Sequence, residues 1–317
     1  MNVAASFNKK YVDYAIVLFT SFCINNPEHN KIFVLHSELE NEDFETLRNA
    51  ISAFDAEIIE LNVCERMNKL QLPVTEFWSK EIYYRLMLPE ILPPDVDRIL
   101  YMDVDVIVHG PVDELYYSDF EGMDLMAADD SNNTNKVGSF KEIVREKIFK
   151  SKEGDIRYFN SGILVMNIEK MRHDYPFEVY LKAMEEWDYQ MSAPDQDILN
   201  YVHYGKVKFI PWEKYDLFAK IALNDGWTYE DVKNKNMIIH FAGAKPWNFD
   251  GLRYEIERFW WEYAAQTPIY HRLIEKFIEN SFTNSFLENE AIRLTNENKA
   301  YAKAINEAKA LLDKLGK

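Results

Sequence analysis

The sequence is poor in cysteine and contains no long apolar run. Two cysteines, Cys23 and Cys64, occur in 317 residues, so we expect no disulfide framework and predict that each thiol is a small buried side chain. No stretch reaches the roughly 18 apolar residues of a membrane-spanning helix, and residues 1–6 lack the basic and apolar segments of an export signal. These absences predict a cytoplasmic protein without a transmembrane segment.

Basic residues are also scarce, because 36 Lys and Arg stand against 53 Asp and Glu, a formal net charge of −17. Neutralisation of phosphates by Lys and Arg dominates affinity for nucleic acid, so this charge argues against a nucleic-acid partner. An anionic nucleotide substrate would therefore need a bound cation or a local basic cluster. Apolar side chains are plentiful at 47%, which is enough for a large α/β domain with a C-terminal addition, or for two ordinary domains.

Strands and helices are predicted to alternate along most of the chain. Helical spacing is predicted for residues 11–23 and 44–54, and a helix around residues 83–87 is expected to be brought to a close by Pro89, Pro93 and Pro94. The apolar runs that predict strands are 2–5, 31–36, 56–61, 99–102, 124–128, 207–210 and 237–239, and residues 159–167 are predicted to be a turn that leads into a buried strand. This alternation predicts an α/β fold, a mostly parallel sheet with helices on both faces. Residues 62–79 are expected to form a mobile flap and residues 131–155 a polar surface insertion.

Two acidic residues, Asp103 and Asp105, follow the predicted strand 99–102. In an extended segment residues i and i+2 point to one side, so we expect both carboxylates to face one point while Val104 and Val106 anchor the other side. Ligands of open α/β sheets bind outside the carboxyl ends of strands. Two like charges at that place indicate a divalent cation that in turn holds phosphate oxygens. So short a motif, taken by itself, is more typical of a solvated turn.

His240 lies at the end of the predicted strand 237–239 and is followed by Gly243 and Lys245. The glycine would let the backbone approach a phosphate, and the lysine would place a cation beside it. One imidazole and two carboxylates with open positions suit Mn²⁺ and accept Mg²⁺, whereas the lack of a thiolate argues against structural zinc. A histidine at a strand end is also typical of a hydrogen-bonded core residue.

Four motifs, in this order along the chain, resemble the set found in the family-8 retaining glycosyltransferases. That family includes glycogenin and the bacterial galactosyl- and glucosyltransferases of lipopolysaccharide synthesis. The motifs are Tyr101–Asp105, Phe159–Gly162, Asp195–Asn200 and His240–Trp247. The resemblance covers roughly residues 1–265, and it implies a GT-A fold with a Rossmann-like sheet that binds a UDP-sugar and Mn²⁺. Residues 266–317 are then expected to be a helical C-terminal extension.

The resemblance also implies a role for individual side chains. By similarity, Asp103, Asp105 and His240 bind the metal. Residues implied in binding the donor, from the uracil to the diphosphate and the transferred sugar, are Ser6, Asn8, Tyr11, Arg85, Val104, Asn160, Ser161, Gly243 and Lys245. Residues implied at the transferred sugar in catalysis are Gln196, Asp195 and Asp130. Gln196 matches the position nearest the sugar ring, where an amide would steady positive charge during a same-face attack.

Several of these residues have a structural interpretation as well. Arg85 would fit a solvated helix face, Asp130 a turn, and Asp195 the first turn of a helix. Asn160 and Ser161 are residue types that often satisfy backbone groups before a strand. The ordered set of motifs, rather than any single residue, favours the functional interpretation.

The implied activity is metal-dependent transfer of galactose or glucose, with retention, from a UDP-sugar to a glycan or glycolipid acceptor. The expected setting is lipopolysaccharide or surface polysaccharide synthesis, in the cytoplasm or at the inner face of the membrane with peripheral contact. The alternatives are a nucleotide-sugar hydrolase and a catalytically idle UDP-sugar-binding assembly protein. A heptad seam between residues 287 and 315, with Asn298 inside it, predicts either a homodimer through this tail or a helix folded back on its own domain.

Overall fold

The computed structural model describes residues 1–70, 72, 79–130, 140–150, 157–248 and 255–283, with short helical stretches between 294 and 309. Within these residues the strands form two sheets. The strands are β1 (Asn2–Ser6), β2 (Asn30–His36), β3 (Ala56–Asn62), β4 (Arg98–Met102), β5 (Val106–His109), β6 (Leu125–Asp129), β7 (Phe159–Asn167), β8 (Val207–Ile210), β9 (Leu217–Phe218) and β10 (Met237–His240).

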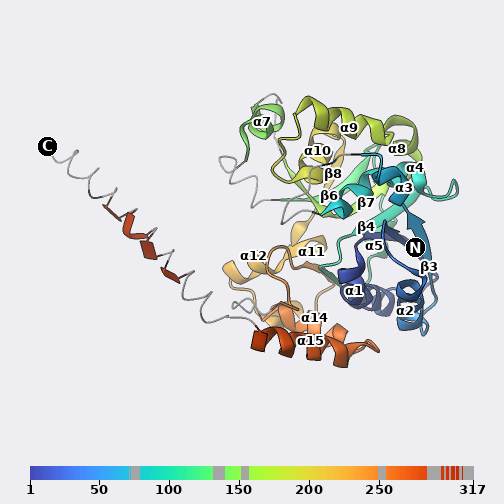
Figure 1. Ribbon diagram of the computed structural model, residues 1–317, viewed down its shortest axis with the longest axis vertical. Helices are drawn as coiled ribbons and strands as arrows, with labels where there is room; N and C mark the ends of the chain where they lie inside the picture. The colour runs from blue at the N-terminus through green and yellow to red at the C-terminus, as the bar shows by residue number, and fades with distance from the viewer. Residues whose placement is uncertain are drawn as a thin grey trace.

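The main sheet has seven strands in the order β3-β2-β1-β4-β7-β6-β8 (Figure 1). Strands β3, β2, β1 and β4 are parallel, and β8 is parallel to β6. Strand β7 is antiparallel to both of its neighbours, β4 and β6. The predicted mostly parallel sheet is therefore confirmed. Its one reversed strand carries its first residues to the carboxyl ends of β4 and β6, where ligands of such sheets bind.

Both faces of this sheet are buried, as the near-continuous apolar strands predict. Successive residues of β1 illustrate it, because Val3 and Ala5 enter one core cluster and Ala4 enters the other. Helices α1, α2 and α14 cover the first face, and α8, α9 and α10 cover the second (Figure 1). Each large side chain buried in this way contributes about 1.5–3 kcal/mol, so two cores hold the strand ends firmly.

The helical elements occupy the connections between strands. The N-terminal and central ones are η1 (Lys9–Tyr11), α1 (Val12–Asn25), α2 (Asn41–Ile51), α3 (Cys64–Met67), the 3₁₀ helix η2 (Lys80–Met87), α4 (Leu88–Ile91), α5 (Asp113–Tyr116), α7 (Glu142–Val144) and the π-helical segment η4 (Arg145–Lys150). The later ones are α8 (Ile168–Asp174), α9 (Phe177–Glu186), α10 (Pro194–Val202), α11 (Trp212–Tyr215), α12 (Ala219–Asn224), α13 (Tyr229–Val232), α14 (Glu257–Ala264) and α15 (Tyr270–Thr283).

Several predicted boundaries are wrong, for local reasons. Pro89 does not end a helix, because it lies in the first turn of α4, where a missing N–H costs nothing. The helical segment instead ends at Ile91, before Pro93 and Pro94. Phe54 follows the end of α2. Of the predicted polar insertion, only residues 140–150 are described, and Phe140, Val144 and Ile148 there are buried in the core rather than on the surface.

Three strands outside the main sheet form a second sheet in the order β5-β10-β9, which the sequence did not indicate. Strand β5 pairs antiparallel with β10, so Val106 lies opposite His240. The chain therefore leaves the main sheet at the end of β4, turns through residues 103–105 and enters the second sheet as β5. This turn brings the aspartates of one motif to the histidine of another.

Helix α15, beyond the predicted boundary at residue 265, packs against the main body. Arg272 and Lys276 each approach a carboxylate oxygen of the buried Asp13 in α1, at 2.5 Å. Leu273 is buried in the same core as α1. The boundary itself stays a prediction.

The heptad seam lies mostly outside the described residues. Those of its positions that are described, such as Leu294, Tyr301 and Ile305, are exposed and helical. No described helix is long and apolar enough to cross a membrane. Of the cysteines, Cys23 is buried as predicted, whereas Cys64 is only partly buried. Burial raises the pKa of Cys23 to about 12, so this thiol is inert.

The contact of Asp13 with α15 gives a test of how this helix is held. We expect Asp13→Asn to lower the free energy of unfolding by about 1–2 kcal/mol, because two part-exposed cations lose their buried partner. Urea denaturation measures the change. The control is Asp55→Asn, where the lost partner is His29 and both side chains are more than half exposed. A change there beyond about 0.5 kcal/mol, or none at Asp13, would contradict the assignment.

Candidate active site

The two aspartates lie in the turn that joins the sheets. Asp103 follows the last residue of β4, and its N–H donates to the carbonyl oxygen of Gly162 in β7 at 2.7 Å. Asp105 occupies the turn itself and its carbonyl oxygen accepts from the N–H of Phe241, at 2.9 Å. The expected extended geometry is therefore wrong. The carboxylates converge because a turn, anchored on both sides, bends the chain back.

His240 completes a cluster of three potential metal ligands with these aspartates. One ligand atom from each of Asp103, Asp105 and His240 lies within 4.8 Å of the others. The Nε2 atom of His240 is 3.5 Å from an oxygen of Asp105. Two oxygens and one imidazole nitrogen at this spacing suit a hard or borderline divalent cation with open positions.

A glycine leaves the space beside this cluster. A Cβ atom built on Gly162 would lie 2.5 Å from Cε1 of His240 and 3.0 Å from Oδ2 of Asp103. Only a residue without a side chain allows the imidazole and the carboxylate to approach β7 so closely. The residues present therefore fit a bound divalent cation.

The charges of the cluster are balanced by neighbouring side chains. Burial raises the pKa of Asp103 above its usual range, and the guanidinium of Arg85 opposes this at 2.8 Å. Burial acts in the same direction on Asp105, but the ammonium of Lys245 and the imidazole of His240 outweigh it and hold its pKa low. Lys245 donates directly to Asp105 and also, at 3.0 Å, to the carbonyl oxygen of Phe241.

The imidazole of His240 is held by a buried carboxylate. Its Nδ1 lies 2.8 Å from Oδ1 of Asp216. Burial lowers the pKa of His240, but Asp105 and Asp216 outweigh that effect and raise it above the ordinary value. The ring is therefore protonated when only protein groups surround it, and a metal at Nε2 displaces a proton. Because Nδ1 stays committed to Asp216, Nε2 is the nitrogen available as a ligand.

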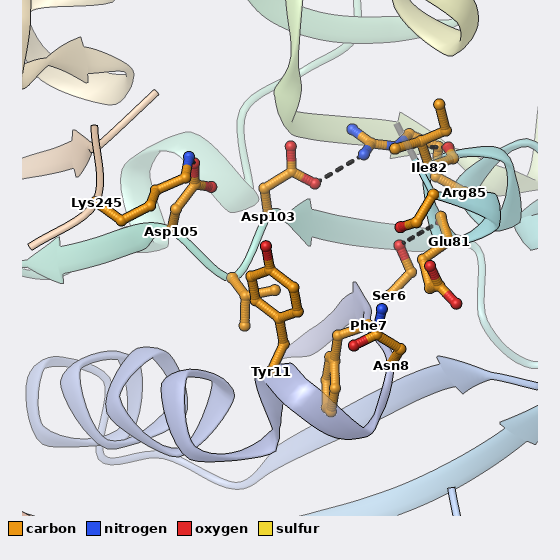
Figure 2. Close-up of a pocket in the computed structure, with 12 residues that line it drawn as sticks. Ser6, Phe7, Asn8, Tyr11, Glu81, Ile82, Arg85, Asp103, Asp105 and Lys245 are labelled. Carbon is orange, nitrogen blue, oxygen red and sulfur yellow. Dashed lines mark hydrogen bonds and ion pairs between the residues drawn. The ribbon is translucent and has the colours of Figure 1, made fainter. Parts of the chain in front are cut away.

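A cavity of about 200 Å³ opens beside the cluster (Figure 2). Asp105 and Lys245 lie at one end of it, and Asp103 lies between them and the other end (Figure 2). The described residues that line it are Ser6, Phe7, Asn8, Tyr11, Ser79, Glu81, Ile82, Arg85, Asp103, Val104, Asp105 and Lys245. Val104 therefore lines the cavity. Our prediction that Val104 anchors the opposite side of the chain was wrong. The end of β1, the start of η2 and the turn after β4 meet at this cavity.

Arg85 connects the cavity with a second layer of predicted residues, namely Asp130, Asn160, Ser161, Asp195 and Gln196. This guanidinium is almost fully buried and donates from Nη1 to the carbonyl oxygen of Ser161 at 2.5 Å. Its Nε lies 3.2 Å from a carboxylate oxygen of Asp195. The hydroxyl of Ser161 donates to the same carboxylate at 3.0 Å. Arg85 is thus a buried link between the two carboxylates Asp103 and Asp195, and not the solvated surface cation of the alternative interpretation.

Gln196 lies at the centre of this second layer. Its amide oxygen accepts from Asn160 Nδ2 at 3.1 Å and from the N–H of Ser161 at 3.0 Å. Its amide nitrogen donates to Asp130 at 3.1 Å. Asn160 and Ser161 belong to strand β7, although we had predicted a turn before the strand. The antiparallel direction of β7 is what carries them to α10.

The remaining predicted residues are less closely connected. Gly243 adopts a φ of +95°, which favours glycine, but it does not line the cavity. Neither do Asn160, Ser161, Asp195, Gln196 and Asp130, which form the second layer. The amide oxygen of Asn8 accepts from the N–H of Lys10 at 3.1 Å and so caps η1. Of the predicted flap at residues 62–79, residues 71 and 73–78 lie outside the described residues. Its first part is not a flap, because residues 64–67 form helix α3, in which Met67 is buried.

Several residues of the site were not predicted from the sequence. Asp216 follows no motif and reaches His240 only through the fold. Tyr14 stacks on Trp247, with ring centroids 4.1 Å apart, and Tyr11 meets the same indole edge-on at 6.5 Å. This contact ties the loop after β10 to the start of α1. Gly162 did leave a signal, because a glycine inside a strand often marks a close approach.

The mostly parallel sheet and the cluster of two acids and a histidine beyond its central strand define a GT-A fold. Comparison with known proteins agrees. Residues 2–251 match the model of "Glycosyl transferase family 8", and the chain belongs to this family. A crystal structure of the galactosyltransferase LgtC in complex with donor and acceptor sugar analogs is 25% identical and superposes with a TM-score of 0.70, over 84% of this chain and 96% of that one.

Two of the curated relatives are bacterial proteins. A lipopolysaccharide 1,2-glucosyltransferase of Escherichia coli strain K12 is 27% identical over 258 residues, covering 78% of this chain and 73% of the relative. A putative glycosyltransferase of Haemophilus influenzae is 29% identical over 210 residues, covering 66% of this chain and 61% of the relative. The chain thus spans between about three fifths and three quarters of these relatives. It is a glycosyltransferase, which uses a sugar donor and a glycan acceptor.

We expect Gly162→Ala to weaken binding of Mn²⁺ about tenfold or more, because the new methyl group displaces His240 or Asp103. Isothermal titration with MnCl₂ measures this. The control is Gly205→Ala, a site with φ of +73° and no atom within 4 Å of the added Cβ. It should lose stability through strain but keep its Mn²⁺ affinity. Equal affinities in Gly162→Ala and the unmodified protein would contradict the proposed fit.

Two substitutions of Asp216 distinguish the effect of its negative charge from its effect on the orientation of the His240 ring. We expect Asp216→Ala to lower Mn²⁺ affinity about 10–100-fold, because the imidazole loses the partner that holds it. Asp216→Asn keeps an oxygen acceptor for Nδ1 and should lose less. The same titration, repeated for both variants, tests the idea, and an equal loss in both would show that the negative charge matters more than the orientation.

Proposed function

We propose that the protein is a metal-dependent retaining hexosyltransferase that moves galactose or glucose from a UDP-sugar to a hydroxyl of a glycan. The observation that carries the proposal is the cluster of Asp103, Asp105 and His240 at the end of a cavity in a protein of formal net charge −17. Such a protein accepts a diphosphate only where cations offset its own charge. We propose Mn²⁺ as the resident cation, with Mg²⁺ as a substitute, held by these three side chains.

The donor would lie along the cavity with its diphosphate at the end formed by Asp105 and Lys245. A bound divalent cation supplies Lewis-acid stabilisation of the negative charge that develops on the leaving diphosphate. Lys245 adds a second positive charge in the same place, and its present contact with Asp105 shows that it reaches the cluster. The uracil would lie at the other end, near Asn8 and Tyr11.

Retention of configuration requires a nucleophile below the ring or an attack on the same face. The carboxylates near Gln196 are already engaged, since Asp195 meets Arg85 and Ser161, and Asp130 accepts from Gln196 itself. This engagement supports the same-face route, in which the leaving diphosphate takes the proton of the acceptor hydroxyl. Gln196, fixed by its three contacts, would then steady the positive sugar ring without covalent bonding.

The wider setting is proposed from the relatives. Since the Escherichia coli relative is a lipopolysaccharide 1,2-glucosyltransferase, we infer a lipopolysaccharide or surface polysaccharide as the acceptor. An acceptor of this kind would bring the enzyme to the inner face of the membrane as a peripheral protein. A homodimer through the C-terminal tail stays a prediction.

The test offers the purified protein a panel of UDP-sugars with Mn²⁺ and follows release of UDP with and without glycan acceptors. We expect release from UDP-galactose or UDP-glucose, raised strongly by an acceptor, lost with EDTA and restored by Mn²⁺. Release that no acceptor increases would indicate a nucleotide-sugar hydrolase. Binding without any release would indicate an idle binding protein.

The matched variant is Asp105→Asn, which keeps the size of the side chain but removes its charge. We expect transfer to fall about 100-fold or more, because the cation that offsets the leaving charge is no longer held. Asp225→Asn, at an exposed position, is the control and should retain full activity. Unchanged transfer by Asp105→Asn would contradict the proposal.

A further inference from the structure

Among the described residues that line the cavity, one carboxylate has no part in the proposed reaction. Glu81, in the first turn of η2, lines the cavity together with Ser6 and Asn8. It lies at the end away from Asp105 and Lys245 (Figure 2). No described residue forms an ion pair or a hydrogen bond with its carboxylate.

One oxygen of this carboxylate is buried without a partner. Oε2 of Glu81 is inaccessible to solvent and has no hydrogen-bond partner among the described residues. A ligand in the cavity therefore does not reach Oε2. The other oxygen, Oε1, is not buried and has no hydrogen-bond partner among the described residues, so a group in the cavity that donates to it gains affinity from a charge that the protein leaves unsatisfied. An acid in the first turn of a helix is favourable for the helix dipole, but that role does not require a buried oxygen.

The backbone of Glu81 is held in place by hydrogen bonds. Its backbone carbonyl oxygen accepts from the hydroxyl of Ser6 at 2.9 Å. The same hydroxyl lies 2.7 Å from the hydroxyl of Tyr101, which donates to Asp103 at 2.9 Å. These hydrogen bonds connect the backbone of Glu81 to Asp103 and so tie the start of η2 to the metal cluster.

The charges along the cavity limit which part of a bound donor can lie next to the Glu81 carboxylate. A diphosphate is repelled by a carboxylate and is drawn to Lys245 and the metal cluster, so the part of the donor near Glu81 is neutral. Asn8 stands in the same wall with its oxygen committed to Lys10, and no described residue accepts from its Nδ2. The pair thus offers one acceptor, from Glu81, and one donor, from Asn8.

We propose that Glu81 determines the base specificity of the donor, by accepting a hydrogen bond from the ring N–H of uracil. This inference rests on the proposed function, in which a UDP-sugar occupies the cavity. The Watson–Crick edge of uracil presents an N–H between two carbonyl oxygens, which matches an acceptor from Glu81 beside a donor from Asn8. Cytosine presents a bare ring nitrogen at that place, so a carboxylate, which only accepts, faces a second acceptor.

The experiment measures the dissociation constants of UDP and CDP in the presence of Mn²⁺, for the unmodified protein and for Glu81→Gln. We expect the unmodified protein to bind UDP at least about tenfold more tightly than CDP, as for one hydrogen bond to a charged group. Glu81→Gln should reduce this ratio about tenfold. The glutamine amide can donate to the ring nitrogen of cytosine and can still accept from uracil.

The control is Glu57→Gln, which removes the same charge at an exposed position on β3 and should keep the ratio unchanged. An unchanged ratio in Glu81→Gln overturns the inference, even if both nucleotides bind more weakly, since a contact with ribose would affect both alike. A loss of thermal stability without a change in the ratio overturns it too, because Glu81 would then serve the fold. If the unmodified protein binds neither nucleotide with Mn²⁺, the proposed function fails as well.

Discussion

The site depends on holding two carboxylates and an imidazole within 4.8 Å of one another, partly out of water. Like charges at that distance repel each other strongly in a protein interior. The fold offsets the repulsion with Arg85 against Asp103, Lys245 against Asp105 and Asp216 against the ring of His240. The proposed divalent cation would add to this balance, at a place where two carboxylates already favour a positive charge.

Strand β7 supplies residues that lie next to the cluster of Asp103, Asp105 and His240. Because it runs against its neighbours, its first residues reach past the end of β4, where Gly162 leaves room for His240. The two residues before the glycine, Asn160 and Ser161, meet Gln196 at the start of α10. Arg85 then connects this layer with the cavity. We therefore expect a change in any of these contacts to affect both the metal cluster and the place proposed for the transferred sugar.

Much of the fold followed from pattern. Alternating apolar strands and helices predicted a mostly parallel sheet with both faces covered, since a strand such as β1 buries every residue only when helices lie on both sides. The pattern failed where the chain changes direction. An apolar run does not state which neighbour it pairs with, so neither the reversed β7 nor the separate sheet of β5, β9 and β10 was predicted.

The sequence by itself determined which residue types meet at the site, because the four motifs carry Asp103, Asp105, His240 and Gln196 in an order that marks the family. Tertiary structure decided how they meet. Residues far apart in the chain, such as Asp216 and His240 or Ser6 and Glu81, come together only through strand pairing and packing that no local pattern records. The physical reason is that a motif specifies side chains and local backbone, whereas long-range contacts depend on the register and direction of whole strands.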